Sequence, residues 1–241
     1  MSACSEQKTP GLADSSAPAR GEPAVYTVNY PLAWMAQELA GNAVSVEFPA
    51  PGDIDPAFWQ PDTDTIMRYQ QADLVLLNGA NYAKWIAGVS LPANRLLDTS
   101  AAYREQLLPA DAGPVHSHGP DGDHSHGELA FTTWLDLDLA GQQAAAVATA
   151  LVRVSPASEA GIKERLVVLQ ARLQAMDAQM QAVGEQLASA PLLYSHPVYQ
   201  YLQNRYQLNG RAMHWEPDVD PGEKEWRALE TLLQAHPARL M

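Results

Sequence analysis

Four of the seven histidines lie within residues 116–126, where the sequence HSHGPDGDHSH contains two His-x-His pairs. The donors are His116, His118, His124 and His126. Imidazole is mostly neutral at pH 7 because its ordinary pKa is about 6.5, so each ring can offer a nitrogen lone pair to a metal ion. Nitrogen donors suit Zn²⁺, whereas Mn²⁺ prefers oxygen. The pattern therefore predicts capture of a metal ion, with Zn²⁺ preferred over Mn²⁺.

The residues around these pairs predict a flexible loop over 113–128. Two glycines, a proline and two aspartates separate the pairs, and such a segment cannot form a packed core. A flexible loop can wrap several donors around one ion, although the entropy lost on ordering it limits the affinity. The alternative interpretation is a solvated linker whose histidines bind nothing.

The composition excludes several classes of function. The 241 residues include 28 acidic and 15 basic side chains, which gives a net charge of −13. This charge leaves no basic field for the phosphates of nucleic acids or for an anionic membrane surface, whereas it attracts cations. The catalytic motifs G-x-S-x-G, H-E-x-x-H, the P-loop and G-x-G-x-x-G do not occur in the sequence. We therefore expect a protein that is not an enzyme.

The elements that must position these donors begin with an alternation of strand and helix patterns. The expected strands are residues 25–30, 43–48, 73–79 and 95–100, and the expected helices are residues 31–41, 62–71 and 82–87. Such alternation predicts a parallel sheet with helices on its faces. Ligands of such sheets gather at the carboxyl ends of the strands, so the loops after Tyr30, Phe48 and Leu77 are expected to surround any site.

A helix over 139–154 and a second, much longer helix follow the loop. Ser155 and Pro156 are expected to start the long helix. Its apolar residues recur at alternating spacings of four and three from Ile162 to Leu187, including Met176 and Val183. They form one stripe along a rod of roughly 40 Å. The stripe suits either a coiled-coil dimer or a spine against which two lobes of one chain pack, and we favour the spine.

Beyond Pro191 the sequence predicts a second, smaller α/β lobe. Its expected elements are a strand and turn over 191–197, a helix over 198–206, a strand over 210–215 and a helix over 222–236. We expect a tether (1–24), an N-terminal lobe (25–136), linking helices (137–190) and a partial C-terminal lobe (191–241). The predicted fold class is α/β: two lobes with parallel sheets, joined by a long rigid helix, the second lobe being short or truncated.

The tether over residues 1–24 carries the single cysteine of the chain, Cys4. Ser, Ala, Pro and Gly dominate this stretch, which predicts a flexible segment. Residues 1–4 resemble the end of a bacterial lipobox, and this resemblance predicts lipidation of Cys4 and residence in the periplasm or cell envelope. Because no apolar export segment precedes Cys4, the alternative is a disordered start that carries a cysteine by chance.

Three stretches of the chain resemble the metal-binding substrate-binding proteins of zinc and manganese ABC importers. They are GDIDPAFWQPDTDTIMRYQQADLVLLNGANYAKW, TTWLD and YSHPVYQYLQNRYQL, and the resemblance extends from about Val25 to His236. It implies two lobes joined by one rigid helix with a metal cleft between them. It also implies export and delivery of the ion to a membrane permease and its ATPase. The histidine-rich insertion resembles the one in zinc-type members, where it gathers or senses zinc.

The ligand positions of that family are only partly filled. The family pattern implies histidines at Ala57 and Thr132, neither of which is a histidine here, and only His196 matches. The acidic ligand that the family supplies late in the second lobe has no counterpart. Because a zinc site needs about three or four ligands, one histidine does not suffice.

Two arrangements could complete a site with His196. Asp55, His214 or Glu216 could approach it from neighbouring strand ends, or the histidine-rich loop could fold back and supply one His-x-His pair. The alternative is that His196 is a core or capping histidine held by hydrogen bonds.

We expect a zinc-binding, solute-binding component of a metal ABC importer, with ion capture by the loop. A zinc buffer or chaperone with a degenerate cleft, not coupled to transport, is the alternative.

Overall fold

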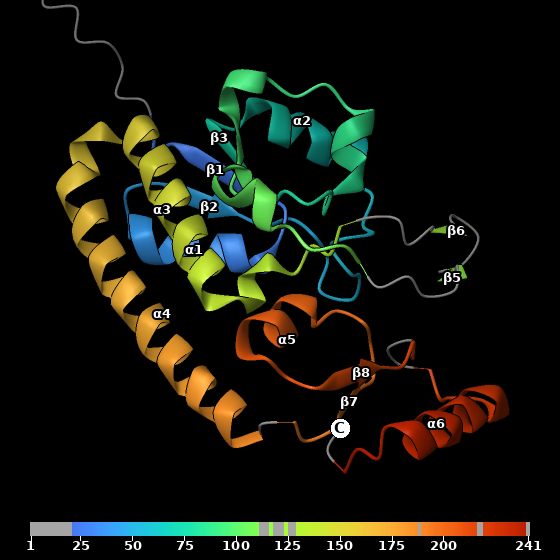
Figure 1. Ribbon diagram of the computed structural model, residues 1–241. Coiled ribbons are helices and arrows are strands. Elements are labelled where there is room, and N and C mark those ends of the chain that lie inside the picture. The colour runs from blue at the N-terminus through green and yellow to red at the C-terminus, as the bar shows by residue number, and fades with distance from the viewer. Residues whose placement is uncertain are drawn as a thin grey trace, which may run out of the picture.

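The computed structural model describes residues 21–110, 129–187, 189–215 and 219–239, together with the backbone of residues 116–117 and 123–124. Two α/β lobes lie beside one long helix, α4 (Glu159–Leu187), which runs along one side of the molecule (Figure 1). The predicted fold class is confirmed. Within these ranges, no helix combines the length and the apolar character needed to cross a bilayer.

The first lobe is built on a four-stranded parallel sheet with the order β2-β1-β3-β4. The strands are β1 (Ala24–Thr27), β2 (Ser45–Glu47), β3 (Leu74–Leu77) and β4 (Leu96–Asp98). The central strand β3 has the sequence LVLL and is buried at its first three positions, as expected where helices cover both faces of a parallel sheet. The strand order reverses between β1 and β3, which is where such sheets bind ligands.

The helices of this lobe begin at side-chain caps. Helix α1 (Tyr30–Ala40) starts where the Asn29 side chain accepts a hydrogen bond from the backbone N–H of Leu32, and Pro31 lies in its first turn. It ends at Gly41, whose φ of 58° favours glycine. Helix α2 (Thr63–Gln71) starts in the same way at Asp62. Because β1 and β2 are parallel neighbours, their carboxyl ends, and the connections to α1 and α2, lie at one edge of the sheet.

The predicted spine packs within the chain. Helix α3 (Leu137–Val154) and α4 form an antiparallel pair against α1, and α4 buries Ile162, Leu169 and Leu173. The expectation that the whole apolar stripe packs against the lobes is wrong at its far end. There Met176 and Val183 are 51% and 41% exposed. There α4 extends past α3, so the apolar positions of its last turns have no helix of the first lobe to cover them (Figure 1).

The second lobe contains a parallel pair of strands, β7 (Leu192–Tyr194) and β8 (Gly210–Ala212). Between them in sequence lies α5 (Gln200–Tyr206), which faces the first lobe in Figure 1. Helix α6 (Glu223–Ala235) follows and has no fully buried residue. His236, just after α6, makes a hydrogen bond of 3.0 Å between its Nε2 and the carbonyl of Leu192, which fixes the end of α6 to β7.

Short 3₁₀-helices connect the main elements. They are η1 (Lys84–Gly88), η2 (Ala93–Arg95), η3 (Ala101–Gln106), η4 (Thr133–Leu135) and η5 (Pro156–Ser158). The short helix expected over 82–87 is present as the 3₁₀-helix η1, which starts at Lys84, after three residues with positive φ, Gly79, Ala80 and Asn81. The long helix likewise starts later than expected, because η5 precedes it.

The histidine-rich stretch contains one short element of backbone pairing. Strand β5 (His116–Ser117) is antiparallel to β6 (Asp123–His124), and His116 is the backbone partner of His124. No regular structure was expected there. The predicted tether with Cys4, most of the loop with His118 and His126, and Glu216 lie outside the described residues.

Candidate functional site

His196 lies immediately beyond the carboxyl end of β7, in the turn that leads to α5. Its Nδ1 is 3.2 Å from the backbone carbonyl oxygen of Trp215. A carbonyl oxygen can only accept a hydrogen bond, so Nδ1 must carry the proton of this contact. The neutral ring then has its lone pair on Nε2, the tautomer in which metal-binding histidines are held by a backbone carbonyl behind them.

His214 comes from the neighbouring strand end. The backbone N–H groups on either side of it, at Met213 and Trp215, donate to the carbonyls of Tyr194 and Ser195 at 2.7 and 2.9 Å. The parallel pairing of β7 and β8 therefore continues past β8 and brings the chain at His214 alongside the residues that precede His196. This places both histidines at one end of the second-lobe sheet, the geometry that one of the two arrangements considered for His196 requires.

Asp55 stands in the first lobe, in the loop after β2. Its Oδ1 accepts a hydrogen bond of 2.9 Å from the backbone N–H of Ala57, and its side chain is exposed. Burial, and to a lesser extent the nearby charge of Asp55, raises the pKa of Tyr82. Ala57 is 2% exposed and belongs to the main hydrophobic core. Asp55 thus orders the turn and faces Tyr82, while Ala57 offers no donor atom.

Thr132 joins the two lobes directly. It is 7% exposed, and its Oγ1 donates a hydrogen bond of 2.6 Å to the carbonyl of Val198, two residues after His196. The position at which the family resemblance implied a histidine therefore carries a hydroxyl that bonds the other lobe. The sequence did not predict this contact, because its two partners are 66 residues apart.

The described residues do not assemble a complete metal site. Among them, no group of three or more His, Cys, Asp or Glu side chains is placed to hold one ion. His196 and His214 share a strand end, but no third ligand of these types joins them within the described ranges. Glu216, His118, His126 and Cys4 lie outside those ranges, and His116 and His124 are described by their backbone alone. A complete set of zinc ligands would have to include residues outside the described ranges.

The histidine-rich stretch leaves the fold at the junction of the two lobes. Pro109 and Leu129 form an isolated antiparallel bridge, and the N–H of Ala130 donates to the carbonyl of Leu108 at 2.9 Å. The hydroxyl of Tyr201, from α5, accepts from the N–H of Leu108 and donates to the carbonyl of Ala130, both at 3.0 Å. The described residues on either side of 111–128 are therefore bonded to each other and to the helix that follows His196.

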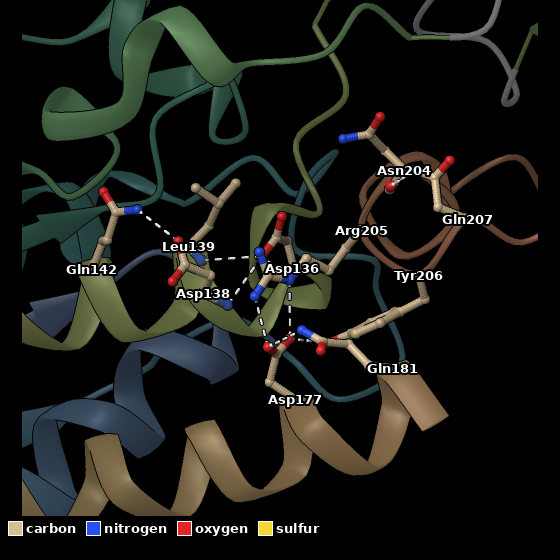
Figure 2. Close-up of polar contacts among 10 residues, drawn as sticks. All are labelled: Asp136, Asp138, Leu139, Gln142, Asp177, Gln181, Asn204, Arg205, Tyr206 and Gln207. Atoms are coloured by element: carbon tan, nitrogen blue, oxygen red, sulfur yellow. Dashed lines mark hydrogen bonds and ion pairs between the residues drawn. The ribbon is translucent and has the colours of Figure 1, made fainter. Parts of the chain in front are cut away.

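A charged cluster beneath this junction ties α5 to the spine. Figure 2 shows the guanidinium of Arg205, from α5, between the carboxylates of Asp177 on α4 and Asp136 at the start of α3. Asp136 caps α3 by accepting from the N–H groups of Asp138 and Leu139. Burial raises the pKa of Asp136, whereas the hydrogen bonds from Arg205 lower the pKa of Asp177.

Sequence reasoning did not identify this cluster or Tyr201 as structurally important. The signals were present in the W-L-D and Y-L-x-x-x-Y segments, which contain Asp136 and Tyr201. The residues that Asp136 and Tyr201 contact cannot be predicted from these segments, however, because they lie in elements far away in the chain.

Comparison with known proteins places the chain in a family. Residues 25–241 match the ZnuA family model, described as zinc-uptake complex component A, periplasmic. No curated protein sequence matches the chain. The metal-dependent lipoprotein YcdH from Bacillus subtilis superposes with a TM-score of 0.73 at 17% identity, over 90% of this chain and 78% of that chain.

Two structures from Streptococcus pneumoniae are also similar to the chain. AdcAII has a TM-score of 0.68 at 17% identity, over 90% of this chain and 77% of that chain. Zn(II)-bound AdcA has a TM-score of 0.74 at 17% identity, over 90% of this chain and 45% of that chain. These likenesses show a shared fold, while the family match covers nearly all of the described residues. The chain therefore belongs to the zinc-uptake ZnuA family, whose members are metal-binding, periplasmic solute-binding components of ABC importers.

Proposed function

We propose that this protein binds Zn²⁺ as the solute-binding component of a metal ABC importer, and that its histidine-rich loop captures the ion. The donors are His116, His118, His124 and His126, and the ion passes toward His196. The ion is delivered to a membrane permease and its ATPase. The protein acts in the periplasm or cell envelope, with Cys4 as the attachment point for a lipid anchor.

One observation carries this proposal: the described residues that flank the loop are bonded to the segment that follows His196. Tyr201 and Thr132 bond the base of the loop to α5 and to Val198. His126 is three residues before Leu129, so an extended chain keeps it within about 10 Å of that residue. This His-x-His pair is therefore tethered to a segment that is bonded to α5, the helix that follows His196. A short tether lowers the entropy cost of bringing donors together.

The hydrogen bond between His196 and Trp215 gives further support. It leaves the Nε2 lone pair of the neutral ring available to an ion. One nitrogen from His196 and two from a His-x-His pair would give the three protein ligands that an open zinc site has. His214, Asp55 and Glu216 remain additional candidates for a fourth ligand.

The proposal is tested by titrating Zn²⁺ calorimetrically into the full chain and into three variants. Deleting residues 116–126 should remove most of the binding. Replacing the four loop histidines by Asn keeps the loop length and should have the same effect. His196→Asn keeps a donor for the Trp215 carbonyl and should weaken binding, whereas the matched control His236→Asn should leave it unchanged. Equal stoichiometry and affinity in the wild type and the deletion variant would refute loop capture.

A zinc buffer or chaperone that is not coupled to import is the second candidate. No three-ligand group is found among the described residues, as expected for a degenerate site, and this favours the second candidate. The two functions differ in their effect on the transporter. If the zinc-loaded protein stimulates ATP hydrolysis by a reconstituted permease and ATPase, and the zinc-free protein does not, the importer function is supported. Zinc binding without stimulation supports the buffer.

A further inference from the structure

A cavity of about 260 Å³, here named the strand-end cavity, lies in the first lobe at the carboxyl ends of three strands. Val28 follows β1, Leu77 ends β3 and Asp98 ends β4, and all three residues line it. The strand order reverses between β1 and β3, which is where parallel sheets of this kind bind ligands. The volume lies just below the range of sites for drug-sized molecules, so a smaller organic ligand would fit.

The turn that follows β3 holds an uncommon backbone conformation beside this cavity. Gly79, Ala80 and Asn81 have φ of 76°, 48° and 58°. Alanine and asparagine are strained there because they carry a Cβ. Strain of this kind persists where the surrounding structure enforces it, and it clusters at ligand sites. Gly79 and Asn81 line the strand-end cavity, so the strained turn forms part of its wall.

Asp98 is the one charged side chain among the described residues that line the cavity. Its Oδ1 accepts hydrogen bonds from the backbone N–H and the hydroxyl of Ser100, at 2.9 and 2.7 Å. Its Oδ2 lies 3.3 Å from Nη2 of Arg104, whose side chain is 71% exposed. Such an exposed ion pair contributes little. Oδ2 is therefore the acceptor that a ligand with N–H groups can use.

The polar groups behind the cavity lack a donor rather than an acceptor. Asn78 lines the cavity and is 1% exposed, and its Oδ1 accepts from Asn29 and Gln143 at 3.1 and 3.5 Å. Gln143 is also 1% exposed, but its Oε1 has no hydrogen-bond partner among the described residues. Because a buried acceptor without a donor is unfavourable, this end of the sheet favours a ligand that donates.

The remainder of the lining is mostly apolar. Val28, Leu77 and Ile86 supply aliphatic surface, and Tyr82 supplies an aromatic ring. Tyr82 is 6% exposed, and an edge contact with Phe131, with 5.1 Å between ring centroids, fixes its ring. Aliphatic surface favours a hydrocarbon chain, and an aromatic ring attracts a cation.

We propose that the strand-end cavity binds a small aliphatic amine in its ammonium form. The ammonium group donates to Oδ2 of Asp98, and the chain lies against Val28, Leu77 and Ile86. An ammonium group offers three donors and no acceptor, and the net charge of −13 attracts cations to the protein. The site uses none of the residues of the proposed zinc function, so it stands or falls independently of that function.

NMR titration of the full chain with n-butylammonium tests the ligand class. The matched probes are n-butanol, which has the same chain without the charge, and butyrate, which has the opposite charge. Butylammonium should shift the amides of residues 77–81 in a saturable way. Butanol should bind about ten-fold more weakly, the effect of losing one charge-assisted hydrogen bond, and butyrate should not bind. Equal affinities for the three probes, or no saturable shift with butylammonium, would overturn the proposal.

Asp98→Asn tests the charged partner. Asparagine keeps an acceptor for Ser100 but removes the charge, so butylammonium should bind about ten-fold more weakly while butanol binding is unchanged. The matched control is Asp73→Asn, because Asp73 accepts from the N–H of Ala24 at the opposite end of the same sheet. An Asp98→Asn protein that binds butylammonium as tightly as the wild type would contradict the proposal.

Ala87→Phe tests the location without changing a buried residue. Ala87 in η1 and Ala93 in η2 are both exposed, but only Ala87 lines the cavity. Ala87→Phe should block butylammonium binding, whereas Ala93→Phe should leave it unchanged, and thermal melting checks the folding of both. Zinc titration should give the same result in both variants and the wild type. Wild-type butylammonium affinity in Ala87→Phe would overturn the assignment of the site to this cavity.

Discussion

The guanidinium of Arg205 binds the carboxylate of Asp177 through two hydrogen bonds, from Nε at 3.0 Å and from Nη2 at 2.6 Å. This bidentate pair joins α5 in the second lobe to the middle of the long helix (Figure 2). Asp136, at the start of α3, lies 3.7 Å from the same guanidinium. One cation thus connects three helices, and the side chains of the Arg205–Asp177 pair are only 28% and 13% exposed.

Replacing Arg205 should destabilise the protein substantially. Arg205→Gln removes the charge-assisted bonds and leaves two carboxylates close together, so we expect a loss of about 2 kcal/mol in the free energy of unfolding. Urea denaturation measures it. The control is Arg227→Gln, because Arg227 pairs with Glu223 on the exposed face of α6, and such pairs contribute about 0.5 kcal/mol or less. Equal losses in the two variants would contradict the importance of the Arg205 cluster.

The acid stability of the protein should depend on Asp177. Hydrogen bonds from Arg205 lower its pKa below the ordinary 3.8, so its stabilising effect is complete above that value and is lost as pH falls through the lowered pKa. The wild type should therefore exceed Asp177→Asn in unfolding free energy at neutral pH, and the difference should shrink below about pH 4. Denaturation at a series of pH values measures this. A difference that stays constant down to about pH 2 would rule out the assignment.

Asp136 should change the pH dependence of the unfolding free energy in the opposite direction from Asp177. Burial raises its pKa, so the folded state binds the proton more tightly than the unfolded state, and protonation favours folding. As pH falls through the raised pKa, this group adds stability, before the loss at Asp177 sets in. NMR titration of the two carboxylates in the folded protein should find Asp136 titrating at a higher pH than Asp177. The reverse order would be inconsistent with the structure.

Thr132→Val tests the direct bond between the lobes. Valine has nearly the same shape but cannot donate to the Val198 carbonyl, and we expect a loss of about 1–2 kcal/mol from that unpaired acceptor. Thr149→Val is the control, because Thr149 bonds the carbonyl of Ala145 within its own helix and is exposed; there the change should stay within about 0.5 kcal/mol. Thermal or urea unfolding gives both values, and a Thr132→Val protein as stable as the wild type would exclude a strong bond.

Gly79→Ala should be far more damaging than Gly88→Ala. Gly79 has φ of 76°, and a Cβ there would collide with the side chains of Ser100 and Asp98. The combined backbone strain and overlap should cost about 3 kcal/mol or more. Gly88 has no atom within 4 Å of a built Cβ and no positive φ, so its substitution should be nearly neutral. Comparable melting temperatures of the two variants would contradict this packing of the turn after β3.

The lobes and the spine could be predicted because their signals are local. The apolar run of β3, the Asn29 and Asp62 caps and the periodic pattern of α4 each express a preference of neighbouring residues. The prediction was wrong where a local preference was overruled, as in the last turns of α4. Met176 and Val183 fit the stripe, but the antiparallel α3 begins only at Leu137 and does not cover them.

The sequence alone determined the donors of this protein and the order of its elements. Two His-x-His pairs, a lone His196 and the residues at positions 57 and 132 can be identified without coordinates, because they are matters of composition and spacing. Only the tertiary structure decided what holds the lobes together around them. The partners of Thr132 and Tyr201 lie 66 and up to 93 residues away, and a hydrogen bond depends on the distance between atoms that the fold alone brings together.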